Sequence, residues 1–105
     1  MKLRKFVKEN NFHDCRANNF IFNKKDNELT FTLFTNQVSG FETSKCYIIK
    51  FYNVIDIKCK KELTDLDDFI LNIWNVKGQA NMIEIIFDDD ECTTIYVTAT
   101  NVEIL

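Results

Sequence analysis

Several residue types are scarce in this sequence of 105 residues, and each scarcity excludes a class of structure or chemistry. The chain has no proline, two glycines and one histidine. No stretch rich in proline, glycine or serine divides it, which favours a single domain over residues 1–105. Gly40 and Gly78 are too few and too far apart for a phosphate-cradling loop, so a nucleotide site of the usual kinds is excluded.

Patterns that bind metals or perform nucleophilic catalysis are also missing. The four cysteines, Cys15, Cys46, Cys59 and Cys92, include no Cys-x-x-Cys pair, and His13 is the only histidine available to complete a site. No serine lies in a Gly-x-Ser-x-Gly elbow. We therefore expect no metal, no other cofactor and no enzymatic activity, and we interpret each cysteine as a small buried apolar residue.

Long apolar runs are absent as well. No segment approaches the roughly 20 apolar residues that a membrane span needs. The basic start Met1–Lys5 is followed only by Phe6 and Val7 before polar residues return, which is too short for a secretory signal. We expect a cytoplasmic protein with reduced thiols and no membrane partner. Twelve asparagines and twelve isoleucines beside no proline indicate an AT-rich coding sequence, from which we infer a bacterial source.

Strand patterns dominate what is present. Apolar residues make up 46% of the chain and include ten phenylalanines, enough for a core and too many for a disordered segment. Leu29–Leu33 alternates apolar and polar residues, and with Phe20–Phe22 it predicts a hairpin around the polar turn 23–27. Cys46–Tyr52 is almost continuously apolar and predicts a central strand. Residues 55–60 alternate again.

One helix is predicted in the second half of the chain. A single apolar stripe at helical spacing is formed by Leu66, Phe69, Ile70, Ile73 and Trp74. Thr64 is a suitable N-cap, the aspartates of the first turn favour the positive end of the helix dipole, and Gly78 is a terminator. These features predict an amphipathic helix at about 65–76, with Trp74 packed in the core.

The final third predicts a second hairpin, residues 82–87 and 92–98, and a short strand at 102–105. Short connections favour antiparallel neighbours. The predicted fold is therefore mainly β, of the α+β type: a curled antiparallel sheet or small sandwich of about seven strands with the one helix. The apolar terminal strand can also pair with a copy of itself, so a homo-oligomer stays open.

Charge is distributed unevenly along the chain. The net charge is +5 over residues 1–25, +1 over residues 26–61 and -9 over residues 62–105, which gives -3 overall. Net acidity argues against nucleic acid as a partner, because its binding needs clustered cations. An acidic surface can instead steer a basic protein partner.

Two groups of polar residues are candidate sites. The possible partner-binding residues are acids of the segment 62–105: Asp65, Asp67, Asp68, Asp88, Asp89, Asp90 and Glu91. Residues 88–91 are also a candidate calcium loop, although the ligand spacing and glycine of an EF-hand are missing and a solvated hairpin tip is favoured. His13 and Asp14 are a possible polar site, either a general base with its orienting acid or, as we favour, a hydrogen-bonded entry into the first strand.

A short set of motifs carries a family resemblance. The segments are Phe12-His13-Asp14-Cys15, Leu29 to Phe34, Ile49-Lys50-Phe51-Tyr52-Asn53-Val54, Ile95-Tyr96-Val97 and Val102-Glu103-Ile104. This layout resembles small β-rich bacterial proteins of uncharacterised families, some of which are similar to immunity proteins encoded beside polymorphic toxins. The resemblance covers residues 12–105 and implies a non-enzymatic protein that neutralises a partner by binding it.

Two functions follow as expectations. The first is a protein-binding module, immunity-like, whose acidic surface engages a basic partner. The alternative is a carrier of a small apolar ligand, held in a pocket inside the curled sheet.

Overall fold

The computed structural model describes residues 1–10, 12, 15–34, 45–66, 69–77 and 81–105. Its elements in chain order are α1 (Leu3–Glu9), β1 (Arg16–Asn23), β2 (Glu28–Phe34), β3 (Cys46–Tyr52), β4 (Asp56–Cys59), the 3-10 turn η2 (Leu63–Asp65), β5 (Phe69–Lys77), β6 (Met82–Phe87), β7 (Thr94–Thr98) and β8 (Asn101–Ile104).

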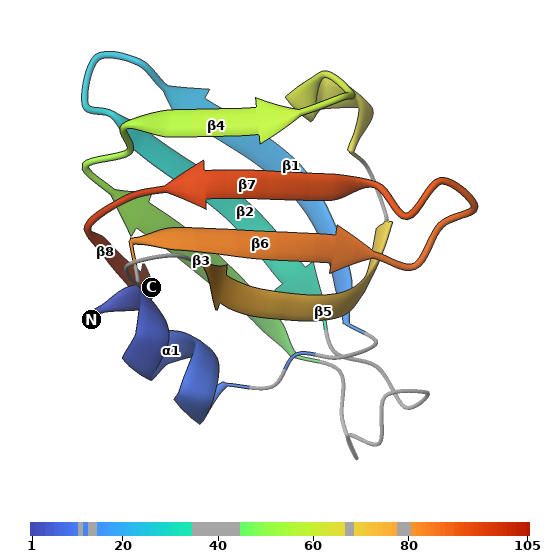
Figure 1. Ribbon diagram of the computed structural model, residues 1–105, viewed down its shortest axis with the longest axis horizontal. Coiled ribbons are helices and arrows are strands. Elements are labelled where there is room, and N and C mark those ends of the chain that lie inside the picture. The colour runs from blue at the N-terminus through green and yellow to red at the C-terminus, as the bar shows by residue number, and fades with distance from the viewer. Residues whose placement is uncertain (11, 13–14, 35–44, 67–68, 78–80) are drawn as a thin grey trace.

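The strands form one antiparallel sheet that curls into two facing layers (Figure 1). The strand order is β4-β7-β6-β5-β1-β2-β3-β8. Four strands lie in each layer, and the layers join where β1 pairs with β5 over two residues, Arg16 opposite Ile70 and Ala17 opposite Phe69. The predicted curled antiparallel sheet is confirmed, with eight strands among the described residues where about seven were expected.

The predicted hairpins are also confirmed. β1 pairs with β2 around a turn in which Asn27 has a φ of 54°, and β6 pairs with β7 around residues 88–93. β3 covers Cys46–Tyr52 as predicted and lies between β2 and β8. Asn53 follows β3 with a φ of 51°, a left-handed conformation that asparagine tolerates better than most residues.

The helix predicted at 65–76 is wrong, because most of that range is strand β5. A bulge between Leu71 and Ile73 shifts the register of β5 against β6. Leu71 and Trp74 are consequently both buried although they are three residues apart, a spacing that imitates a helix. Thr64 lies within η2 and caps no helix, and Gly78 lies outside the described residues.

Among the described residues, the α-helix is instead the basic N-terminal segment α1. Leu3 and Phe6 lie one turn apart and are buried, while its charged side chains are exposed. The ring of Phe6 meets that of Trp74 edge to face at 5.1 Å between centroids. The helix packs against β5 and β8, so it covers the open end between the two layers (Figure 1).

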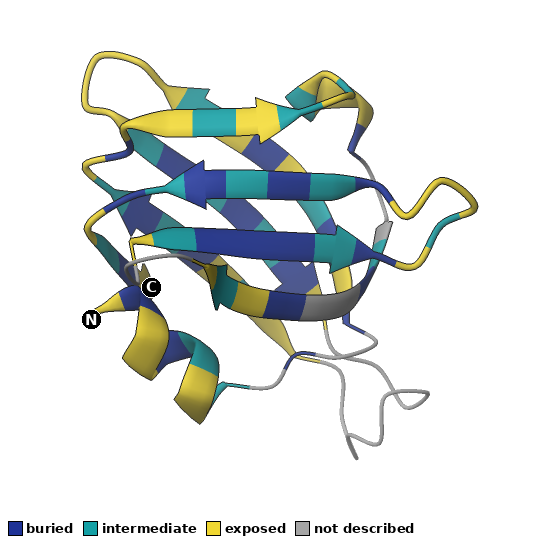
Figure 2. Ribbon diagram, viewed as in Figure 1, coloured by how far each residue is buried: buried dark blue, intermediate teal, exposed yellow. Residues whose placement is uncertain are grey.

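The inward faces of both layers form one continuous core (Figure 2). Burial alternates along β2 and β7, as the two-residue period of a strand requires. Phenylalanines fill the centre: Phe20 stacks on Phe31 at 4.7 Å between ring centroids, and Phe20 meets Phe87 edge to face at 5.9 Å. The space inside the curled sheet is therefore occupied by side chains.

Candidate functional site

Five of the predicted partner-binding acids, Asp65 and residues 88–91, gather at one end of the molecule. Residues 88–91 form the turn between β6 and β7, and Asp65 closes η2; both segments lie at the end remote from α1 (Figure 1). Asp65, Asp88, Asp90 and Glu91 are exposed. We call Asp65 together with residues 88–91 the acidic end.

The turn of the acidic end is held in shape by Asp89. Its carboxylate accepts hydrogen bonds from the backbone N–H of Thr93 at 2.6 Å and from the Thr93 hydroxyl at 2.5 Å. Partial burial alone would raise the pKa of Asp89, but the Thr93 hydrogen bonds and the charge of Lys61 outweigh it and hold that pKa below its usual value. Asp89 is therefore a structural anchor of the turn.

The same turn is tied to the segment that follows β4. The ammonium of Lys61 lies 3.7 Å from a carboxylate oxygen of Asp89 and 3.6 Å from one of Glu91. The positive charge of Lys61 therefore offsets part of the negative charge of Asp89 and Glu91. Within the described ranges, no group of three or more His, Cys, Asp or Glu side chains is placed to hold a metal ion.

A group of basic side chains lies toward the opposite end. The basic side chains of α1 and of the residue before it are all exposed: Lys2, Arg4, Lys5 and Lys8. The tip of the β1–β2 hairpin, which carries Lys24 and Lys25, also points away from the acidic end (Figure 1). The charge asymmetry of the sequence therefore becomes a partial separation of charge in space, because Lys60 and Lys61 still lie beside Glu91.

The other predicted site residues are only partly described. His13, Asp14, Asp67 and Asp68 lie outside the described residues. Their neighbours Phe12 and Cys15 are buried.

The prediction that every cysteine is buried holds for Cys15 and is wrong for Cys46 and Cys92, which are exposed; Cys59 is half-buried. Cys46 alternates outward at the start of β3, and Cys92 sits in the β6–β7 turn with a φ of 49°.

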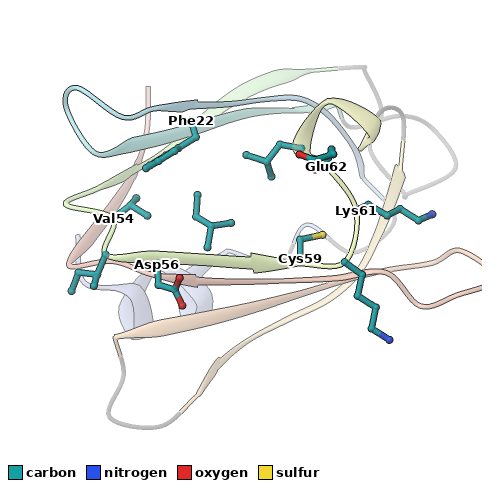
Figure 3. Close-up of a pocket in the computed structure, with 10 residues that line it drawn as sticks. Phe22, Val54, Asp56, Cys59, Lys61 and Glu62 are labelled. Carbon is teal, nitrogen blue, oxygen red and sulfur yellow. The ribbon is translucent and has the colours of Figure 1, made fainter.

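A hollow that the sequence did not predict lies where the curled sheet fails to close. It has a volume of about 400 Å³ and lies between β4, the β1–β2 hairpin and η2. Figure 3 shows Phe22 reaching down from the hairpin and Cys59 rising from β4, whereas Lys61 extends away from the space between them. We call it the seam hollow. Nine of its ten lining residues come from the stretch 54–63, and the tenth, Phe22, comes from the hairpin.

No helix in the described part of the chain is long and apolar enough to cross a membrane. Comparisons of this sequence and structure with protein-family models, curated proteins and solved structures find no match.

Proposed function

We propose that this chain is a non-enzymatic protein-binding module whose acidic end docks onto a basic protein partner. The observation that carries the proposal is the separation of charge between the acidic end and α1. Such an arrangement orients an approaching basic protein before contact and raises the rate of productive encounter. A turn already fixed by Asp89 and Thr93 also loses little conformational entropy when it binds.

The same proposal includes an immunity-like role, in which the partner is a basic toxin encoded by the neighbouring gene and binding blocks its activity. Its support is the motif resemblance over residues 12–105 together with the charge of the acidic end. A filled interior also favours a function of the surface over one of a central pocket.

The test is to coexpress this chain with the product of the adjacent gene. The proposal expects a stoichiometric complex with a dissociation constant measurable by calorimetry, and rescue of host growth if that product is toxic. Affinity is expected to fall as salt rises, because exposed charges are screened. No complex with the neighbouring product, or a complex of unchanged affinity between low and high salt, would overturn the proposal.

A further inference from the structure

β4 is a border strand of the sheet (Figure 1), and the pairing of its neighbour β7 shows which backbone groups of β4 the sheet uses. At the ends of β7, the N–H of Phe87 donates to the carbonyl of Thr93 at 2.9 Å, and the N–H of Ala99 donates to the carbonyl of Asn81, also at 2.9 Å. Odd-numbered residues of β7 therefore direct their backbone groups toward β6, and even-numbered residues direct theirs toward β4.

The register of β4 against β7 then identifies the outward groups of β4. Asp56 and Lys58 lie opposite even-numbered residues of β7, so their N–H and C=O groups face β7. Those of Ile57 and Cys59 face the other way, out of the sheet. Across the described residues, no backbone hydrogen bond joins these outward groups to another segment. The edge of β4 therefore presents hydrogen-bond donors and acceptors that a further strand could use.

The same edge leaves an apolar side chain uncovered. Ile55, the residue before β4, is 73% exposed, the highest value for a large apolar side chain in the described part of the chain. Its N–H donates to the carbonyl of Thr98 at 2.7 Å, which holds Ile55 beside β7 at the start of the edge. Exposed apolar surface beside unused backbone groups is typical of an edge that pairs with another strand.

The charges of β4 are self-complementary in one register. Asp56 points away from the seam hollow (Figure 3), and its carboxylate lies 3.8 Å from the ammonium of Lys58. In an antiparallel pair of two β4 strands centred on Ile57, Asp56 of each copy lies directly opposite Lys58 of the other, so the four charges alternate in sign. Lys60 then lies opposite Val54 of the other copy and meets no like charge. A pair centred on Lys58 or on Asp56 instead places like charges opposite each other at its axis.

We propose that the edge of β4 binds β4 of a second copy of this chain, which makes a weak dimer with two-fold symmetry. Ile57 exchanges two backbone hydrogen bonds with its counterpart, Asp56 and Lys58 form reciprocal ion pairs, and Cys59 lies opposite Ile55. β4 has four residues, a length of about 13 Å at 3.3 Å per residue, so the contact is small and the dimer forms at high protein concentration. The proposal does not rest on the protein partner proposed for the acidic end.

Charge-reversed variants of the full chain test the register, with self-association measured by sedimentation equilibrium at low salt. Asp56→Lys places four lysines at the axis of the pair, and Lys58→Asp places four aspartates there. Each variant alone should self-associate about fivefold or more weakly than the parent chain. An equimolar mixture should recover the parent affinity, because every lysine then lies opposite an aspartate. Lys60→Glu is the matched control and should associate as the parent does, since the residue opposite it is uncharged.

A second pair of variants tests the backbone contact. Ile57→Pro removes the outward N–H at the axis without touching the β4–β7 ladder, because proline is tolerated on the free side of an edge strand. Ile57→Val keeps that donor and a branched apolar side chain. Ile57→Val should self-associate as the parent chain does, and Ile57→Pro about fivefold or more weakly, since it deletes two hydrogen bonds of the symmetric pair. Thermal melts of both variants check that each is folded.

Amide hydrogen exchange gives a separate readout on the parent chain. Exchange at Ile57 should slow as protein concentration rises, while Lys58, already bonded within the sheet, changes less. If Ile57→Pro does not fold, the charge variants and the exchange data decide.

Three results would overturn the proposal. The first is a parent chain that stays monomeric at about 1 mM protein in low salt, or a mixture of Asp56→Lys and Lys58→Asp that associates no better than its components. The second is a loss in Lys60→Glu as large as that in Asp56→Lys, which would exclude the register centred on Ile57. The third is concentration-dependent protection in β8 but not at Ile57, which would assign self-association to the terminal strand.

Discussion

The indole N–H of Trp74 donates a hydrogen bond to the backbone carbonyl oxygen of Asn10, with 3.0 Å between donor and acceptor. This contact joins β5 to the residue that ends α1. The rings of Phe6 and Phe12 lie edge-on to Trp74, at 5.1 and 5.3 Å between centroids. Trp74 thus holds the N-terminal helix over the open end of the curled sheet. Its ring packs against the two phenylalanines and its indole N–H makes the hydrogen bond.

Trp74→Phe is expected to destabilise the fold by weakening the contact between β5 and α1. The substitution keeps an aromatic ring in the core but removes the donor to Asn10 and leaves some unfilled volume. A loss of about 1–3 kcal/mol is expected in the free energy of unfolding. Urea unfolding followed by circular dichroism measures it, since the variant has no tryptophan fluorescence. An unchanged midpoint would mean that α1 is not held by this residue.

Asp89→Ala is expected to loosen the β6–β7 turn. It removes the acceptor for two Thr93 hydrogen bonds, at a cost of about 1–2 kcal/mol of stability at neutral pH. Asp90→Ala, an exposed neighbour in the same turn, is the matched control and should cost less than about 0.5 kcal/mol. Chemical unfolding of the three proteins side by side makes the comparison, and equal losses for the two variants would contradict the anchoring role.

The contribution of Asp89 should also depend on pH. Because folding lowers the pKa of its carboxyl, the stabilisation is present above the unfolded value of about 3.9 and is lost as pH falls through the folded value. The stability difference between the parent chain and Asp89→Ala should therefore be constant from about pH 5 to 7 and shrink in more acidic solution. If the stability difference between the two proteins grew as pH fell, it would contradict a lowered pKa for Asp89 in the folded state.

Tyr52 should titrate later than an ordinary tyrosine. Its hydroxyl donates to the carboxylate of Glu103 on the neighbouring strand β8, and this bond, with partial burial and the nearby charges of Glu103 and Glu28, raises the pKa of Tyr52 to about 12. Glu103→Gln should return that pKa toward about 10, as seen by ultraviolet absorbance of the phenolate. Glu28→Gln, which removes only a distant charge, should shift it less.

The curled sheet was predictable because strand periodicity survives in the final structure. The alternation of Leu29–Leu33 and of residues 94–98 reports directly on which side chains face the core. The helix at 65–76 was mispredicted because the bulge in β5 replaces the two-residue period by a three-residue step. The true helix escaped notice because Leu3 and Phe6 are too few apolar residues to mark a stripe.

The candidate site was predictable in part, and for a related reason. Consecutive acids at 88–91 mark a turn whose position follows from the hairpin on either side of it. That Lys61 would lie against Asp89 depends on how β4 pairs with β7 and not on sequence distance. The seam hollow depends on how residues 54–63 lie against the hairpin that carries Phe22, and no local sequence pattern predicts that contact.

The terminal strand illustrates how an exposed edge is partly protected. The N–H of Val102 in β8 donates to the backbone carbonyl of Met1 at 2.9 Å, so the start of the chain occupies part of the edge that a second copy would need. Self-association through residues 102–105 stays a prediction, open to sedimentation analysis. Ile104 and Leu105 remain exposed there.

The central claim is that the acidic end steers a basic partner, and the association rate constant with the neighbouring gene product tests it most directly. Stopped-flow measurements compare the parent chain with Asp90→Lys in the acidic end and Asp26→Lys in the β1–β2 turn, two exposed sites that receive the same change of charge at opposite ends of the molecule (Figure 1). The account predicts that Asp90→Lys slows association about three- to tenfold at low salt, that Asp26→Lys has a smaller effect, and that high salt removes the difference. Equal rates for the two variants at low salt, or rates that do not depend on salt, would contradict it.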